Sequence, residues 1–183
     1  PNVGEKSLLS EETIGVPPRK PEPPAPKPEE VDIPNSVSPI DNPMFRYDGK
    51  DTIGHPEFGA SRDKKGKKYD HEGVDLRAAP GSDIKSPVSG KVVKIGHAYA
   101  GKEYRTVWVE TADGHRVGMF YMTPFDADGN PIVSKGDTVE AGQVDGTMQD
   151  LTKMNPRMDN HLHLEIKKND VVLDPAPWLE EWG

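Results

Sequence analysis

The chain has 183 residues, enough for one domain and a tail or for two small domains, and its hydrophobic fraction of 33% and mean hydropathy of -0.76 indicate that part of it lies outside a packed core. A formal net charge of -8 argues against a nucleic-acid partner, because phosphate binding requires clustered Lys and Arg side chains. The absence of cysteine excludes thiol nucleophiles, disulfide bonds and thiolate metal sites, and no apolar run approaches the roughly 18 residues that a membrane span needs.

The first 45 residues are rich in proline. They hold eleven of the nineteen prolines, concentrated in PPRKPEPPAPKPEE, Pro17 to Glu30. Proline removes backbone donors and fixes φ, so this run favours an extended polyproline II spacer; a ligand for a proline-binding groove is the alternative. We therefore expect residues 1–45 to form a proline-rich linker and residues 46–183 to form the folded domain. Since the sequence begins at Pro1 without an apolar leader, we also expect it to be a fragment of a longer chain.

From about Asn42 the composition is typical of a globular β-protein. Turn signals recur roughly every eight to twelve residues, and the Asp113–Gly114 pair between two β-rich runs is a strong hairpin signal. No segment has a long helical period, so we predict an all-β or β-dominated fold of antiparallel strands with one short helix near Leu151–Asn155. The predicted strands are Lys91–Ile95, Thr106–Thr111, Val117–Met122, Gln143–Met148, His161–Ile166 and Val171–Leu173.

The run NHLHLEI, Asn160 to Ile166, places two histidines among strand-forming residues. Side chains alternate faces along a strand, so His161 and His163 lie on one face together with Glu165, and the leucines lie on the other. The leucine face would then pack into the core and the histidine face would carry a site. The alternative, which is more common for such a pair, is that both histidines are solvent-exposed residues without a functional role.

A second cluster, in HEGVDLRAAPGS from His71 to Ser82, favours a metal site. His71 and Asp75 are four residues apart, which in an extended segment places both on one face. Zinc binds imidazole nitrogen and carboxylate oxygen, and a catalytic zinc site uses three protein ligands and a water. His71, Asp75 and one of the two later histidines would complete that set, and the other histidine would lie where a general base belongs. The alternative is a group of unrelated surface residues.

Together these motifs resemble the lysostaphin/LytM-type zinc peptidases, which share an H-x-x-x-D motif and a later H-x-H motif. The resemblance implies a lysostaphin-like peptidase domain, a duplicated hybrid motif of antiparallel sheets, preceded by the proline-rich extended tail. It also implies one Zn2+ per chain, held by His71, Asp75 and His163, with His161 as the general base. It covers about residues 54–180 and includes the segments His55–Arg62, Asp70–Gly96, Lys135–Thr147 and Asp174–Leu179.

The sequence departs from the family pattern at two positions. Family enzymes carry a further histidine in a Y-x-H-L strand, whereas this chain reads GMFYMTP, so that Tyr121 or, in another register, Thr123 takes its place. We favour Tyr121, because a phenol can donate to a developing oxyanion. This strand and the stretch DLTKMNPRMDNHLHLE, Asp150 to Glu165, are similar to leukocyte cell-derived chemotaxin, which keeps the zinc-binding fold and is regarded as non-enzymatic. The other departure is Asp145, which replaces an apolar residue and which we expect at an exposed edge.

The resemblance implies a zinc-dependent peptidoglycan endopeptidase that cleaves stem-peptide or cross-bridge bonds; a catalytically silent zinc-binding module that binds peptidoglycan or a protein partner is the alternative. The expected substrate contacts are Arg62, in the basic run RDKKGKK, and Asn160 and Thr123. Expected partners are the peptidoglycan peptide, an upstream carrier such as a phage tail or secretion-system spike, and an inhibitor or immunity protein. We expect the protein to act, by delivery, in the periplasm or the extracellular cell-wall space, and we expect neither a nucleic-acid partner nor a membrane span.

Overall fold

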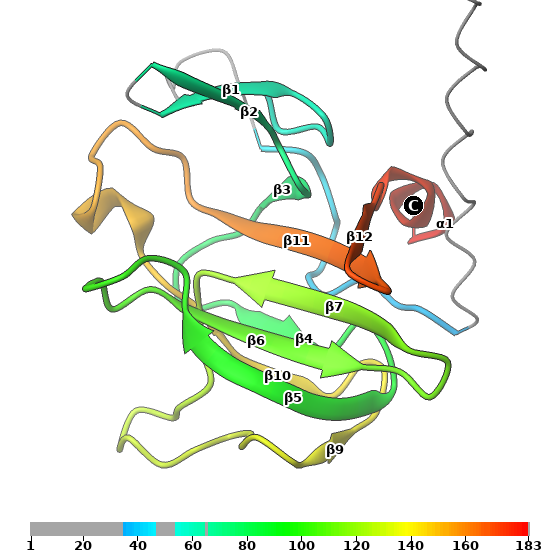
Figure 1. Ribbon diagram of the computed structural model, residues 1–183. Helices are drawn as coiled ribbons and strands as arrows, with labels where there is room; N and C mark the ends of the chain where they lie inside the picture. The colour runs from blue at the N-terminus through cyan, green and yellow to red at the C-terminus, as the bar shows by residue number, and fades with distance from the viewer. Residues whose placement is uncertain (1–34, 47–53, 65, 183) are drawn as a thin grey trace, which may run out of the picture.

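The strand from His161 to Lys168, β11, is the element around which the largest sheet is built (Figure 1). One of its edges pairs with β7, and the other pairs first with β3 and then with β12. The computed structural model of the chain describes residues 35–46, 54–64 and 66–182. The proline-rich run Pro17–Glu30 lies outside the described residues.

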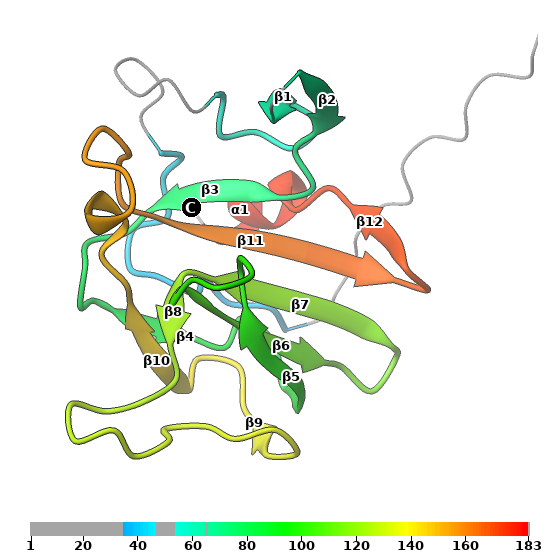
Figure 2. The ribbon, with the colours of Figure 1, turned by 60° about the vertical axis from the view of Figure 1, so that its left-hand side comes forward.

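The described chain is dominated by antiparallel strands, as the sequence predicts. In chain order its elements are β1 (Ser61–Lys64), β2 (Lys67–Asp70), β3 (Val74–Arg77), β4 (Asp83–Lys85), β5 (Gly90–His97), β6 (Arg105–Glu110), β7 (His115–Phe120), β8 (Met122–Thr123), β9 (Thr138–Val139), β10 (Val144–Met148), the 3-10 helix η1 (Leu151–Lys153), β11 (His161–Lys168), β12 (Val171–Leu173) and α1 (Ala176–Trp182). The large sheet has the order β12-β11-β7-β6-β5-β9, with β3 also paired to β11. A small sheet has the order β4-β10-β8 and lies near the beginning of β11, and β1 and β2 form a separate hairpin (Figure 2). Among the described residues, no helix has both the length and the apolar character needed to cross a membrane.

The core follows from the alternation of side chains along the strands. Leu162, Leu164 and Ile166 of β11 are fully buried, as the strand period predicts. They belong to one apolar cluster with residues of the small sheet, including Ile84 of β4 and Met148 of β10. Each fully buried side chain of this size stabilises the fold by roughly 1.5–3 kcal/mol. The leucine face of β11 therefore anchors the strand and leaves its other face to carry the site.

The predicted strand Val117–Met122 is divided in the structure, with β7 ending at Phe120 and β8 beginning two residues later. Tyr121 between them has a φ of 67°, in the left-handed region that non-glycine residues seldom adopt. Two hydrogen bonds hold this conformation: the Tyr121 N–H donates to the Arg105 carbonyl, and the Tyr121 carbonyl accepts from the Gln149 N–H, each at 2.8 Å. Because the strand breaks here, the neighbouring side chains of Phe120 and Tyr121 both line one cavity instead of pointing to opposite faces.

The segment 35–46 packs against the domain. Ile40 is 4% exposed and belongs to the core, and Arg46 is 2% exposed. The Val37 N–H donates to the Pro87 carbonyl at 2.9 Å. The boundary predicted between residues 45 and 46 therefore falls inside a packed segment, because these contacts are long-range and proline content does not reveal them.

Asp145 is fully buried in β10, so the expectation of an exposed edge is wrong. A register shift between Val144 and Gly146, where β10 pairs with β4, marks an irregularity at this residue. Within the described part of the chain, neither carboxylate oxygen has a hydrogen-bond partner. Burial raises the pKa of Asp145 to about 7.

Candidate metal centre

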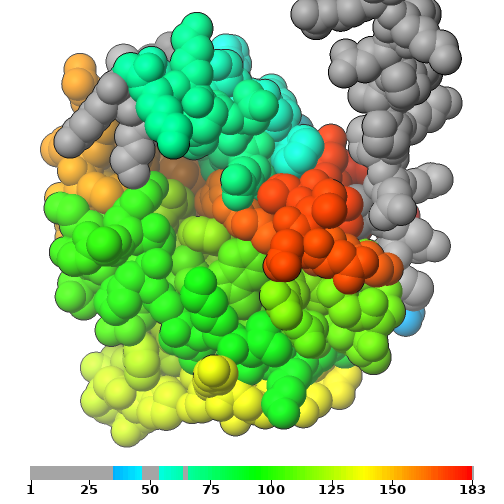
Figure 3. All heavy atoms as spheres, in the orientation of Figure 1, coloured from blue at the N-terminus to red at the C-terminus, as the bar shows by residue number. Residues whose placement is uncertain are grey.

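The register of β11 between its two neighbours brings the site together. His163 lies opposite Asp75 of β3 on one side and opposite Phe120 of β7 on the other, and directly opposed residues point to the same face of a sheet. His71 directly follows β2, and its backbone N–H donates to the Ala60 carbonyl at 2.9 Å. All of these side chains except that of Ala60 line a cavity of about 560 Å³. Figure 3 shows the surface hollowed between the β1–β2 hairpin and the strands of the large sheet, where this cavity lies.

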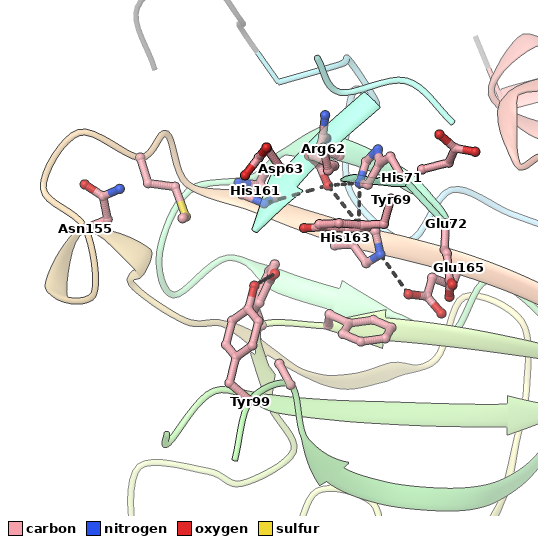
Figure 4. Close-up of a pocket in the computed structure, with 16 residues that line it drawn as sticks. Arg62, Asp63, Tyr69, His71, Glu72, Tyr99, Asn155, His161, His163 and Glu165 are labelled. Atoms are coloured by element: carbon pink, nitrogen blue, oxygen red, sulfur yellow. Dashed lines mark hydrogen bonds and ion pairs between the residues drawn. The ribbon is translucent and has the colours of Figure 1, made fainter. Parts of the chain in front are cut away.

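Three potential ligand atoms meet in the cavity. His71 Nε2 lies 3.1 Å from Asp75 Oδ1 and 3.0 Å from His163 Nδ1, and His163 Nδ1 lies 2.9 Å from Asp75 Oδ1 (Figure 4). All three residues are buried. Tetrahedral zinc ligands about 2.0–2.2 Å from the ion lie about 3.3–3.6 Å apart, so the cluster has to open by only about half an ångström to hold zinc.

His71 and His163 each use the ring nitrogen that points away from the three ligand atoms to form another hydrogen bond, which fixes where the ring proton lies. His71 Nδ1 lies 2.8 Å from the Glu57 carbonyl, and His163 Nε2 lies 3.0 Å from Glu165 Oε1. Carbonyl and carboxylate oxygens only accept hydrogen bonds, so these nitrogens carry the protons and donate. In the neutral rings, His71 Nε2 and His163 Nδ1 then present lone pairs to each other and to Asp75. Three acceptor atoms in contact require a cation between them.

Without a metal, a proton supplies that positive charge. Burial lowers the pKa of His163, but hydrogen bonds to Asp75 and Glu165 outweigh burial and raise it to about 9. Burial likewise opposes ionisation of Asp75, but hydrogen bonds from His163 and His71 hold the pKa of Asp75 well below its usual value. Two imidazole nitrogens and one carboxylate oxygen are ligands that zinc prefers, and they leave a fourth position open, so the residues present fit a zinc ion.

Glu165 connects the centre to a small charge network on the same face of the sheet. Its Oε1 accepts from His163 Nε2 at 3.0 Å, and its Oε2 lies 3.0 Å from Lys167 Nζ. Lys167 Nζ also lies 3.2 Å from Glu72 Oε2. A carboxylate that accepts from the outer nitrogen of a metal-binding histidine orients the ring and raises its basicity.

His161 lies beside the three ligand atoms and differs from them in its environment. Its Nδ1 donates to the Asp159 carbonyl at 2.7 Å, so its Nε2 is the unprotonated nitrogen, 3.8 Å from Asp75 Oδ1. Burial lowers the pKa of His161, although the charge of Asp75 acts in the opposite direction. The ring is therefore neutral at neutral pH, and Nε2 is free to accept a proton.

Tyr121 lies beside His161, with the two ring centroids 5.3 Å apart and the rings nearly perpendicular. The Tyr121 and Tyr99 hydroxyl groups are 2.6 Å apart and share a hydrogen bond. Burial raises the pKa of Tyr121, so its phenol stays protonated and can donate. The ring of Tyr104 packs edge-on against Tyr121, with its centroid 6.3 Å away, while its own hydroxyl donates to the Asp150 carbonyl.

Six of the eight predicted site residues line the cavity: Arg62, His71, Asp75, Tyr121, His161 and His163. The other two lie elsewhere. Asn160 accepts from the Leu151 N–H through Oδ1 at 2.7 Å, and Thr123 pairs with Thr147 in the small sheet. Arg62 is 8% exposed, and its Nη2 lies 3.4 Å from Asp75 Oδ2.

Several residues that shape the site carry no signal in the sequence. Arg46, which lies 3.0 Å from Asp75 Oδ2, is the first residue of the predicted domain, and Tyr99 lies in the connection between β5 and β6. Glu57 and Asp159 act through their backbone carbonyls, which any residue type could supply. None of these positions stands at a recognisable ligand spacing.

Comparison with known proteins relates the chain to a family of peptidases. The profile of peptidase family M23 matches residues 69–175. Leukocyte cell-derived chemotaxin-2 from Bos taurus is 28% identical over 130 residues, which are 70% of this chain and 76% of the bovine protein. The catalytic domain of the antimicrobial peptidase lysostaphin from Staphylococcus simulans has a TM-score of 0.51 and 27% identity, over 68% of this chain and 89% of that domain. The solution structure of lysostaphin has a TM-score of 0.56 and 24% sequence identity, over 81% of this chain and 55% of that chain. The match therefore spans about half of lysostaphin.

Proposed function

Because the chain belongs to peptidase family M23, a family of zinc peptidases, we propose that it is a zinc-dependent endopeptidase of bacterial peptidoglycan. The observation that carries the proposal is the contact of His71 Nε2, Asp75 Oδ1 and His163 Nδ1 at 2.9–3.1 Å inside the cavity. Three protein ligands with an open fourth position are typical of catalytic zinc sites, whereas structural sites use four.

The chain's own residues support hydrolysis of a peptide bond. When bound, zinc supplies Lewis-acid catalysis, which polarises a carbonyl group and lowers the pKa of water to about 7. His161 accepts a proton at Nε2, because its Nδ1–H donates to the Asp159 carbonyl and burial keeps the ring neutral. Asp75, 3.8 Å away, stabilises the imidazolium that forms, and His161 can then return the proton to the leaving amine.

The tyrosine pair is the chain's substitute for the further histidine of the family pattern. If Tyr99 donates to Tyr121, the Tyr121 hydroxyl proton remains available for a developing oxyanion. Hydrogen bonds in series polarise one another, so Tyr99 would strengthen Tyr121 as a donor. The strained backbone of Tyr121, with φ of 67°, agrees with this role, because such strain concentrates at functional sites.

Peptidoglycan is the proposed substrate on the strength of the motifs shared with lysostaphin/LytM-type peptidases and of the likeness to the lysostaphin catalytic domain. We place the activity in the periplasm or the extracellular cell-wall space, reached by delivery on a carrier domain. An inhibitor or immunity protein is part of the same proposal. The bond cleaved would be in the stem peptide or in the cross-bridge.

A second candidate function is a zinc-binding module without turnover. One observation favours it: the chain has Tyr121 between β7 and β8, and no histidine there, where the family pattern has one. Leukocyte cell-derived chemotaxin-2, a relative 28% identical over 130 residues, has a name that refers to signalling and not to cleavage. Losing one oxyanion donor costs roughly 10²–10³ in rate, which weakens an enzyme without abolishing it, so we keep cleavage as the first candidate.

Metal analysis of purified protein tests the ligand assignment. We expect one zinc per chain in protein prepared without added metal. His71→Ala and His163→Ala are expected to remove the zinc, whereas His161→Ala is expected to keep it. Equal loss of zinc in His161→Ala and His163→Ala would contradict the separation of base and ligand.

A further inference from the structure

We propose that Arg46 is a positioning residue of the metal centre, which holds Asp75 as a ligand through one oxygen only. The proposal rests on the zinc binding proposed above and not on peptide cleavage. Arg46 Nη2 lies 3.0 Å from Asp75 Oδ2, while Asp75 Oδ1 faces His71 and His163. The two carboxylate oxygens therefore have separate partners.

The contact between Arg46 and Asp75 is built from both side chain and backbone. The Arg46 side chain has no exposed surface, and its Nη2 also donates to the Gly54 carbonyl at 2.7 Å. The Arg46 N–H donates to the Asp75 carbonyl at 2.8 Å, and the Arg77 N–H donates to the Met44 carbonyl at 2.9 Å. The residues on both sides of this ion pair are thus fixed, and the guanidinium group has little freedom to leave Oδ2.

A carboxylate can bind a metal through one oxygen or through both, and the choice depends on what holds the second oxygen. A charge-assisted hydrogen bond from a guanidinium is about twice as strong as a neutral one. Turning Oδ2 of Asp75 toward the metal would break that bond and bury the guanidinium against the ion. Arg46 therefore keeps Oδ1 pointed at the cluster before metal arrives and leaves the fourth position open afterwards.

Arg62 contributes less to this arrangement. Its Nη2 lies 3.4 Å from the same Oδ2, a longer contact than that of Arg46. Arg62 comes from β1 and lines the cavity, whereas Arg46 comes from the segment that pairs with β3 through backbone hydrogen bonds. Arg46 also precedes the part of the chain that matches the family profile, residues 69–175. The metal centre is thus supported by a residue supplied from outside that match.

Zinc affinity is the direct test, measured by competition with a chromophoric chelator. Loss of a group that orients a metal ligand typically weakens binding 10–100-fold, so we expect Arg46→Met to raise the zinc Kd by 10–100-fold. Arg46→Lys keeps a charge but not the planar fork, and a smaller increase is expected. Lys85→Met is the matched control: it removes the 2.7 Å ion pair with Asp41 that ties the same segment to β4, without touching Asp75.

The control should leave the Kd within about twofold of wild type. A folded Arg46→Met or Arg46→Lys variant with the wild-type Kd would overturn the proposal. Zinc X-ray absorption of the wild-type protein provides a test that needs no variant, since a second carboxylate oxygen of Asp75 at bonding distance would also overturn it. A wild-type chain that binds no zinc would refute both this inference and the proposed function, whereas unchanged affinity in the variants refutes the inference alone.

Discussion

Asp145 places an ionisable carboxyl group in the apolar interior, and we expect Asp145→Asn to stabilise the protein at alkaline pH. The side chain is fully buried, and among the described residues its two oxygens have no hydrogen-bond partner. The Ser86 hydroxyl group beside it donates instead to the Val88 carbonyl at 2.8 Å. Asparagine has nearly the same shape and never ionises, so it removes the charge while keeping the packing.

The magnitude follows from the difference in pKa between folded and unfolded chains. Burial raises the pKa of Asp145 from 3.8 to about 7, so the folded protein binds this proton more tightly than the unfolded chain does. The resulting stabilisation is fully present below about pH 4 and is lost as the pH rises through 7. Each unit of pKa difference is equivalent to about 1.4 kcal/mol, so the protein loses about 4 kcal/mol of unfolding free energy by pH 8 and above. About 2–3 kcal/mol of this loss occurs from pH 5 to pH 8.

Urea unfolding of the zinc-free proteins at several pH values between 5 and 8 measures this difference. The unfolding free energy of Asp145→Asn, relative to wild type, should increase by about 2–3 kcal/mol across that range. Asp83→Asn, which removes an exposed carboxylate of β4 in the same small sheet, controls for the change in net charge. Parallel curves for wild type and Asp145→Asn would refute the reasoning, because they would mean that Asp145 ionises as an ordinary carboxyl group.

Three further predictions concern the site and the packed N-terminal segment. Glu165→Ala should raise the zinc Kd about 10–100-fold in chelator competition, because His163 loses the acceptor that orients its ring; an unchanged Kd would contradict this. Tyr121→Phe should lower kcat in a muropeptide cleavage assay with little change in KM, whereas Thr123→Ala in the small sheet should leave kcat unchanged; the opposite result would assign the oxyanion donor to Thr123. Ile40→Ala should cost about 2–4 kcal/mol in urea unfolding, because Ile40 is 4% exposed within the core; a cost below 1 kcal/mol would show that its segment packs loosely.

The parts of the fold that the sequence predicts are the strands with clear apolar alternation. The run His161–Ile166 lies within β11, and Val171–Leu173 has the bounds of β12. The residues of β2 are all exposed, so no apolar pattern marks that strand. Helix α1 has seven residues, too few for a helical period, although Asp174 accepts from the Ala176 N–H at 2.9 Å and Pro175 follows it, which is a helix-start signal.

Some residues of the candidate site can be recognised from their local spacing in the sequence, whereas others depend on contacts between distant parts of the chain. His71 and Asp75, like His161 and His163, stand at spacings that an extended segment converts into a shared face, so sequence alone selects them. Arg46 is different, because its position beside Asp75 depends on how the chain folds back over 29 residues. Strand alternation also fails where the backbone departs from a regular strand, and the site contains such a departure between β7 and β8.

Cleavage of purified peptidoglycan by the zinc-loaded protein tests the central claim most directly. Soluble products are separated and examined by mass spectrometry for new amino and carboxyl termini within the stem peptides or cross-bridges. We expect such products from the wild-type protein, their loss after metal removal with recovery on adding zinc, and none from His161→Ala, which should still bind zinc. If the zinc-loaded wild type binds sacculi but releases no fragment from any common cross-link type, the protein is a binding module and not a peptidase.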